Sequence, residues 1–222
     1  MNQEVWTAVD HYINELLVPR DPVLDAALEA SAAAGLPFIQ VSPPQGKLLH
    51  LLARLQGAHK ILEIGTLGGY STIWMARALP PGGRVLTLEA DAKHAEVARS
   101  NFARAGLSGV IELRLGPALK MLPQIAAEGR GPFDLIFIDA NKSTMAEYFD
   151  WALKLSRPGS VIIADNVIRD GGVTDAASTD PDIQGVRRFN ERLAAEPRVS
   201  ATEIQTVGSK GYDGFALAVM ND

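Results

Sequence analysis

Apolar and polar positions divide the chain into a helical first part and a longer alternating part. The spacing of apolar residues predicts a first helix over residues 5–17. Start and stop signals predict a second helix from Asp21 to just before Gly35, and a third from Ser42 to about Leu55. These three helices form a predicted N-terminal extension over residues 1–56.

The alternating part contains five short apolar runs, rich in Ile, Val, Leu and Phe, at 60–64, 84–89, 110–115, 134–139 and 160–165. Such runs are typical of strands that are buried on both faces of a parallel sheet. Helical segments separate them at 71–79, 91–105, 118–127 and 144–156, the last with Thr144 as its expected N-cap. A further helix is expected near Asp180.

Two last apolar runs, 201–207 and 214–220, are separated only by residues 208–213. This connection is too short for a helical crossover, so the pair is predicted to be an antiparallel hairpin that closes the sheet. The sequence therefore predicts an α/β fold with a doubly wound, seven-stranded, mostly parallel sheet and one antiparallel strand. We expect a single Rossmann-like domain over residues 1–222, with its core at 57–222.

Composition excludes several classes of function. The 222-residue chain carries a formal net charge of −5 and no run of Lys and Arg, which argues against binding nucleic acid or a membrane surface. It has no cysteine, which excludes disulfides, iron–sulfur clusters and thiolate zinc sites. The first residues contain no basic segment followed by an apolar run, so no signal peptide is expected. No stretch approaches the roughly 18 consecutive apolar residues that span a bilayer. A cytoplasmic location is expected.

A glycine-rich turn, Gly65-Thr66-Leu67-Gly68-Gly69, follows the first predicted strand. Its spacing is not the G-x-G-x-x-G of a dinucleotide-binding turn. Glu63, just before the turn, suits a cationic or amine-bearing ligand, and Glu89 at the end of the second strand suits ribose hydroxyls. S-adenosylmethionine (SAM) carries an ammonium group, a sulfonium group and a ribose. The alternative is that the glycines only shape a tight turn and that Glu89 is a solvated charge.

Carboxylates end the two next central strands. Asp139 follows the fourth apolar run, and Asp165 with Asn166 ends the fifth. If these strands are neighbours, the three side chains converge at the edge where ligands bind in open α/β sheets. Oxygen ligands of this kind suit Mg²⁺, Mn²⁺ or Ca²⁺. The alternative is that the acids are helix caps or turn residues.

The chain resembles the caffeoyl-CoA and catechol O-methyltransferase family, particularly its small bacterial members. The resemblance extends from Val41 through the final hairpin and includes the stretches LEIGTLGGYS, GPA, FIDANK and ADN. It implies an enzyme that transfers a methyl group from SAM to a hydroxyl of a catechol-type phenol, with a divalent cation as second cofactor. It also implies a homodimer.

The glycine turn and the resemblance together assign roles to individual residues. Lys142 matches the general base, and the metal ligands match Asp139, Asp165 and Asn166. Contact with substrate is implied for Asp139 and Asp170. The implied SAM-binding residues are Val41, Glu63, Gly65, Thr66, Gly69, Ser71, Glu89, Ala118, Asp139 and Asn141.

Two positions depart from the family pattern. Asn141 stands where many members have a second aspartate beside SAM, so we expect weaker cofactor binding with the same reaction. Arg169 stands where the plant enzymes have tryptophan, which argues against the plant mode of binding an acyl-CoA substrate.

The expected chemistry is an in-line methyl transfer to a deprotonated phenol. A phenol titrates near pH 10, so ionising it at neutrality requires a shift of about 3 units, or roughly 4 kcal/mol. A divalent cation can supply this shift, and it disfavours the charged form of a nearby lysine, here Lys142. The alternative for Lys142 is a solvated loop lysine. Rival functions are a nicotinamide-dependent oxidoreductase and a non-catalytic SAM-binding regulator.

Overall fold

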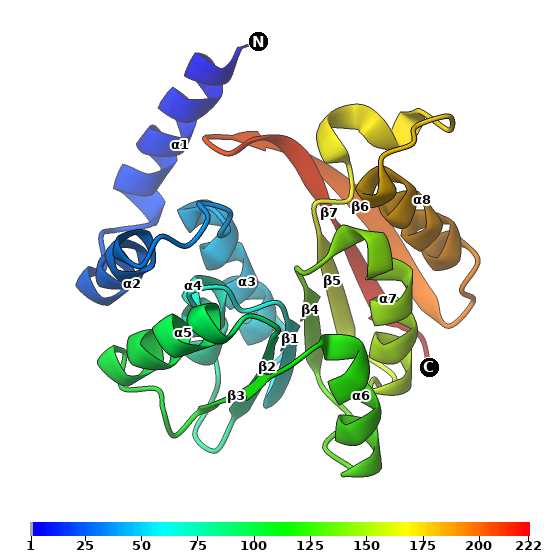
Figure 1. Cartoon of the computed structure of the whole chain (residues 1–222), viewed down its shortest axis with the longest axis horizontal. Coiled ribbons are helices and arrows are strands. Elements are labelled where there is room, and N and C mark those ends of the chain that lie inside the picture. The colour runs from blue at the N-terminus through cyan, green and yellow to red at the C-terminus, as the bar shows by residue number, and fades with distance from the viewer. Residues whose placement is uncertain (1) are drawn as a thin grey trace.

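A seven-stranded sheet runs through the middle of the molecule, and the computed structural model describes residues 2–222 (Figure 1). The strands are β1 (Lys60–Ile64), β2 (Arg84–Glu89), β3 (Ile111–Leu115), β4 (Leu135–Ile138), β5 (Val161–Asp165), β6 (Val199–Gly208) and β7 (Gly211–Met220). Their order is β3-β2-β1-β4-β5-β7-β6. Strands β1 to β5 pair in parallel, and β7 runs antiparallel to both β5 and β6. The predicted fold class is confirmed.

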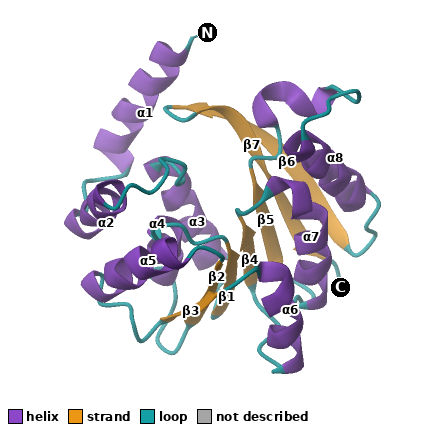
Figure 2. Ribbon diagram, viewed as in Figure 1, coloured by secondary structure: helices purple, strands orange, loops and turns teal. Residues whose placement is uncertain are grey.

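Helices cover both faces of the sheet, as Figure 2 shows. One side carries α2 (Pro22–Ala33), α3 (Pro43–Leu55), α4 (Tyr70–Ala76) and α5 (Ala92–Arg104), and the other carries α6 (Ala118–Ala127), α7 (Met145–Lys154) and α8 (Pro181–Ala194). Helix α1 (Gln3–Leu17) extends away from the central strands and meets the sheet at the β6–β7 hairpin. Two 3-10 turns, η1 (Lys142–Thr144) and η2 (Arg169–Thr174), precede α7 and α8. Within residues 2–222, no helix combines the length and the apolar character needed to cross a membrane.

Successive residues of the central strands enter two separate hydrophobic cores. In β1, Ile61 packs in the core beneath α4 and α5, and Leu62 in the core beneath α6 and α7. In β4, Leu135 and Ile136 divide in the same way, and all four side chains are 0% exposed. Burial of each such side chain contributes about 1.5–3 kcal/mol. The continuous apolar runs therefore do mark strands that are covered on both faces.

Most of the predicted helix starts are capped as the sequence suggests. Asp21 accepts hydrogen bonds from two backbone N–H groups at the start of α2, and Asp91 does the same at the start of α5. Thr144 lies at the N-cap position of α7, as predicted, but its side chain makes no capping hydrogen bond. Its hydroxyl donates to the Asn141 carbonyl instead, because the chain winds through the turn η1 before α7 begins.

The predicted C-terminal hairpin is present, but its strands are longer than the apolar pattern indicated. Pairing continues to Gly208 and Gly211, so only two residues form the turn in place of the expected 208–213 connection. The positions added near the tip, Gly208 and residues 211–213, are partly exposed and carry no apolar alternation. The hairpin tip reaches α1 (Figure 1), where Gln3 donates to the Gly208 carbonyl at 2.9 Å and Asp10 accepts from the Ser209 N–H at 2.7 Å.

Candidate functional site

Two cavities adjoin at the carboxyl ends of the parallel strands. The first, here called the glycine-turn cavity, measures about 780 Å³ and lies over the ends of β1, β2 and β4. The second, the hairpin cavity, measures about 510 Å³. It lies between residues 38–45, which lead into α3, the end of β5 and the β6–β7 hairpin. Their linings share Ile39, Gln40, Val41, Asn166 and Arg169. A ligand in one cavity can therefore meet a ligand in the other.

Most residues predicted to bind the cofactor line the glycine-turn cavity, namely Val41, Gly65, Thr66, Ser71, Glu89, Ala118, Asp139 and Asn141. Glu63 and Gly69 do not line it. Gly69 has a φ of +83°, and a Cβ there would lie 2.3 Å from the Phe102 ring. Gly69 thus allows α5 to pack against the turn, and its contact with the cofactor stays a prediction.

Gly65 sets the distance between the glycine turn and the end of β4. Its φ is +100°, a region that favours glycine, and an added Cβ would lie 2.0 Å from the Asp139 carbonyl oxygen. The two backbones approach this closely only because Gly65 has no side chain. Asp139 is thereby held directly beside the cavity that the turn encloses.

Glu89 joins the end of β2 to the glycine turn. One carboxylate oxygen accepts hydrogen bonds from the Thr66 and Leu67 N–H groups, at 3.2 and 2.7 Å. The other accepts from Ala90 and Asp91, both at 2.9 Å. The alternative of a solvated charge is wrong, because Glu89 is only 8% exposed. Four backbone donors fix the carboxylate at the cavity wall.

Glu63 lies behind the cavity wall, completely buried. Its carboxyl group accepts hydrogen bonds from Ser71 and Thr87, each at 2.6 Å, and from Thr72. Burial raises the pKa of Glu63 to about 7, although the three hydroxyl donors oppose this shift. Glu63 therefore acts on the cavity through Ser71, whose hydroxyl it orients.

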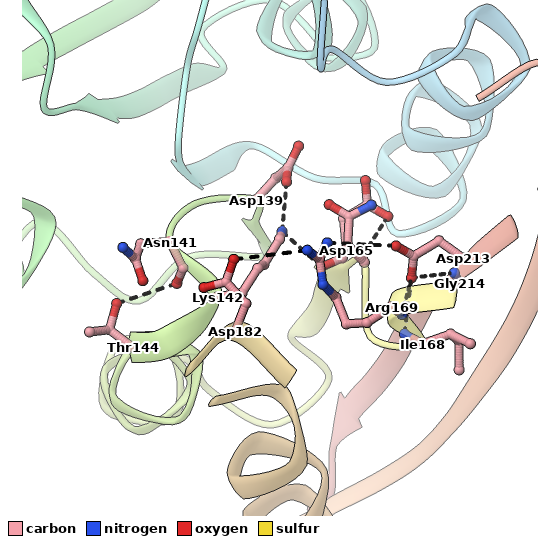
Figure 3. Close-up of polar contacts among 11 residues, drawn as sticks. Asp139, Asn141, Lys142, Thr144, Asp165, Ile168, Arg169, Asp182, Asp213 and Gly214 are labelled. Atoms are coloured by element: carbon pink, nitrogen blue, oxygen red, sulfur yellow. Dashed lines mark hydrogen bonds and ion pairs between the residues drawn. The ribbon is translucent and has the colours of Figure 1, made fainter. Parts of the chain in front are cut away.

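Lys142 lies between the two predicted metal-binding carboxylates, as Figure 3 shows. Its ammonium group donates to an Asp139 carboxylate oxygen at 2.9 Å and to the Asp165 carbonyl at 3.0 Å. The residue is 8% exposed, so the alternative of a solvated loop lysine is wrong. The parallel pairing of β4 with β5 brings these groups together, as the sequence predicted.

Asp139, Asp165 and Asn166, here called the acid cluster, contain two carboxylates and have one ammonium group, that of Lys142, beside them. Burial and the neighbouring charge of Asp139 raise the pKa of Asp165 to about 7, while Lys142 and a hydrogen bond from the Asn166 N–H oppose the shift. A divalent cation would relieve this cost, and carboxylate and amide oxygens are the ligands such cations prefer. Residues 2–222 contain no cluster of three or more His, Asp or Glu side chains that could hold a metal ion. The predicted ligand set is of another kind, because its third member is the amide of Asn166. The donors fit Mg²⁺, Mn²⁺ or Ca²⁺.

Several residues of the site were not evident from the sequence. Gln45, interpreted only as part of a helix start, also lines the hairpin cavity. His94 lines the glycine-turn cavity 3.7 Å from Glu89, and its position on α5 gave no signal of this. Asp170, a predicted substrate residue, lines the hairpin cavity, whereas Asp139 lines the other one. The two predicted substrate residues therefore line different, adjoining cavities.

Comparison with known proteins agrees with this arrangement. The model of a family described as O-methyltransferase matches residues 15–219. The chain is 58% identical to a catechol O-methyltransferase of Niastella koreensis, over 99% of this chain and 100% of that protein. An O-methyltransferase from Bacillus cereus, solved in complex with SAH, is 61% identical with a TM-score of 0.98, covering 99% of this chain and all of that one. The O-methyltransferase TomG of Streptomyces achromogenes, involved in tomaymycin synthesis and solved with SAM, is 55% identical with a TM-score of 0.96 over both full chains.

The sheet order, the glycine turn and these likenesses define a SAM-dependent enzyme that methylates oxygen. The chain belongs to the O-methyltransferase family, as the match over residues 15–219 shows. Neither a nicotinamide-dependent oxidoreductase nor a purely regulatory SAM-binding protein is favoured by these findings.

The buried carboxyl group of Glu63 gives the fold a testable pH dependence. Between the ordinary pKa of 4.5 and the folded-state pKa of about 7, the folded protein keeps a proton that the unfolded chain releases. The free energy of unfolding therefore falls as pH rises through this window, by up to about 3 kcal/mol. We expect Glu63→Gln, which cannot ionise, to lose less stability than wild type between pH 4.5 and 7 in urea unfolding. Parallel pH profiles of the two proteins would contradict this account.

Proposed function

We propose that the enzyme transfers the methyl group of SAM to one hydroxyl of a catechol-type phenol, with the help of a divalent cation. The observation that carries this proposal is the meeting of two cavities at a pair of carboxylates with an amide and a buried lysine. The name of the Niastella koreensis relative supports the catechol substrate class.

The glycine-turn cavity is the proposed site of SAM. Its volume of about 780 Å³ is within the range of cavities that enclose ligands of this size. Glu89 would accept the ribose hydroxyls, and Ser71, held by Glu63, would meet the polar end of the cofactor. The side-chain oxygen of Asn141 accepts from both the N–H and the hydroxyl of Ser143, at 2.9 and 2.6 Å. An amide in this place adds no negative charge beside the sulfonium, so we propose weaker SAM binding than an aspartate would give.

Asp139, Asp165 and Asn166 are the proposed ligands of the cation, and the substrate would occupy the hairpin cavity beside Asp170. When bound, Mg²⁺, or alternatively Mn²⁺ or Ca²⁺, supplies the Lewis acidity that lowers the pKa of a phenolic hydroxyl. The chain itself holds the two reactants in line where the cavities adjoin. Alignment of this kind contributes several kcal/mol to lowering the barrier.

Lys142 is the proposed general base. As a neutral amine, its Nζ atom would receive the phenolic proton as the oxygen attacks the methyl carbon and the carbon–sulfur bond breaks, with the electrons of that bond staying on sulfur. The hydrogen bonds to Asp139 and to the Asp165 carbonyl hold Nζ beside the proposed ligand atoms. The ammonium form balances the charge of the cluster, and loss of its proton before methyl transfer prepares the residue as the base.

Removal of divalent metal tests the first part of the proposal. We expect excess EDTA to lower catechol methylation at least 100-fold, and Mg²⁺ in excess of the chelator to restore it, because the cation supplies most of the required pKa shift. Turnover is measured by the formation of methylated product. Calorimetric titration with SAM serves as the control for folding. Full activity in EDTA would show that the acid cluster has another role.

The base assignment is tested by Lys142→Met, which keeps the buried side-chain volume and removes the amine. We expect kcat to fall by about 10²–10⁴, the usual contribution of general base catalysis, with SAM still bound. Lys120→Met, on the exposed face of α6, is the matched control and should retain wild-type kcat. Equal kcat values for the two variants would exclude Lys142 as the base.

We also propose a homodimer that forms through α1. Large apolar side chains of this helix are 48–68% exposed, namely Val5, Val9, Tyr12, Leu16 and Leu17. Contiguous exposed apolar surface of this kind marks an interaction site. We expect sedimentation equilibrium to give twice the chain mass of 23.8 kDa, and Leu16→Glu to give the monomer mass. A monomeric wild type at micromolar concentration would refute this assembly.

A further inference from the structure

Arg169 occupies the boundary between the two cavities and lines both of them. Its backbone is held in an unusual conformation, with a φ of +53°. Asp213 on β7 fixes it there, since one of its carboxylate oxygens accepts the N–H groups of Ile168 and Arg169, both at 3.0 Å, and of Gly214 at 2.9 Å. A non-glycine residue in this region costs about 1 kcal/mol or more, so the surrounding contacts must impose the position.

The guanidinium group of Arg169 has N–H donors that no residue in the described part of the chain accepts. No hydrogen bond within residues 2–222 engages its side chain, and its Nε is buried without a partner. Two carboxylates flank it at longer range, Asp182 at 3.8 Å and Asp213 at 3.9 Å, as Figure 3 shows. These distances allow ionic attraction but exceed those of hydrogen bonds. Buried donors are nearly always paired in folded proteins, so the missing acceptor points to a ligand.

The flanking acids orient the guanidinium without occupying its donors. Their side chains are 42% exposed in Asp182 and 23% exposed in Asp213, so water screens part of their charge. A ligand carboxylate in direct contact with the guanidinium is therefore attracted more strongly than the two more distant aspartates repel it. The arrangement holds the group in place at the cavity boundary.

Lys210, the other basic residue along the hairpin cavity, is already engaged. Its ammonium group donates to the Phe38 carbonyl at 2.7 Å and lies 3.8 Å from the centre of the Phe38 ring. Arg169 is therefore the basic side chain of this cavity whose donors remain open, within the described residues.

We propose that Arg169 determines specificity by binding a carboxylate carried by the catechol acceptor. The planar guanidinium matches a carboxylate with two parallel, charge-assisted hydrogen bonds. This inference rests on the proposed function, because it names a subclass of the same substrates. The acceptor is then a catechol acid, with its hydroxyls toward the acid cluster and its carboxylate toward η2.

The experiment compares 3,4-dihydroxybenzoate with 4-methylcatechol, which lacks the carboxylate. We expect the wild-type kcat/KM to favour the acid, and Arg169→Met to reduce the ratio of the two kcat/KM values at least tenfold, mainly through KM. Arg169→Lys keeps the charge without the fork and should restore part of the ratio. Arg99→Met removes an exposed arginine that lines neither cavity and should leave the ratio unchanged.

Calorimetric titration of SAM into each variant confirms that it is folded and identifies the ligand of the guanidinium. If Arg169→Met weakens SAM binding and slows both catechols equally, the guanidinium binds the cofactor carboxylate and the inference is overturned. Turnover of both catechols by wild type without preference also overturns it, while leaving the proposed function intact. Absence of turnover with either catechol defeats the proposed function, and this inference with it.

Discussion

Negative charge concentrated in a nearly dry place governs the architecture of this site. Asp139 and Asp165 end neighbouring strands, and burial together with the charge of Asp139 disfavours the ionised form of Asp165. The buried ammonium of Lys142 offsets part of this cost by donating to an Asp139 carboxylate oxygen and to the Asp165 carbonyl, and the Asn166 N–H donates to an Asp165 carboxylate oxygen. Everything nearby serves to hold these charges at a fixed separation: the parallel pairing of β4 with β5, the absent side chain of Gly65, and the turn η1 that carries Lys142.

The two cavities differ in how completely their charged groups are paired. Around the glycine-turn cavity, backbone N–H groups and hydroxyls satisfy the carboxylates of Glu89 and Glu63, so the wall is rigid and already paired. Around the hairpin cavity, the guanidinium of Arg169 keeps open donors between distant acids. The first cavity is suited to one unvarying ligand. Along the second, the hydrogen-bond donors of Arg169 remain open, and enzymes that share a fold differ in such sites.

The sequence was sufficient for those features that depend on local pattern. Continuous apolar runs identified the strands, and Asp139 and Asp165 could be placed together because parallel strands end at one edge of a sheet. The pattern failed where tertiary contacts decide. The hairpin extends through Gly208, Gly211, Tyr212 and Asp213, which carry no alternating apolar pattern, and the side chain of Thr144 makes no capping hydrogen bond at the start of α7. The hydrogen-bond partners of Glu63 come from segments that no spacing rule connects.

The hairpin cavity draws its walls from distant parts of the chain. Asp10 on α1 and residues 38–45 line this cavity together with residues from 206–215. Gln3 and Asp10 on α1 form hydrogen bonds with the tip of the hairpin. The glycine-turn cavity draws its strand ends from β1, β2 and β4, which are complete by Ile138. The hairpin cavity is therefore complete only when the last two strands have joined the sheet, whereas no residue after Asp182 lines the glycine-turn cavity.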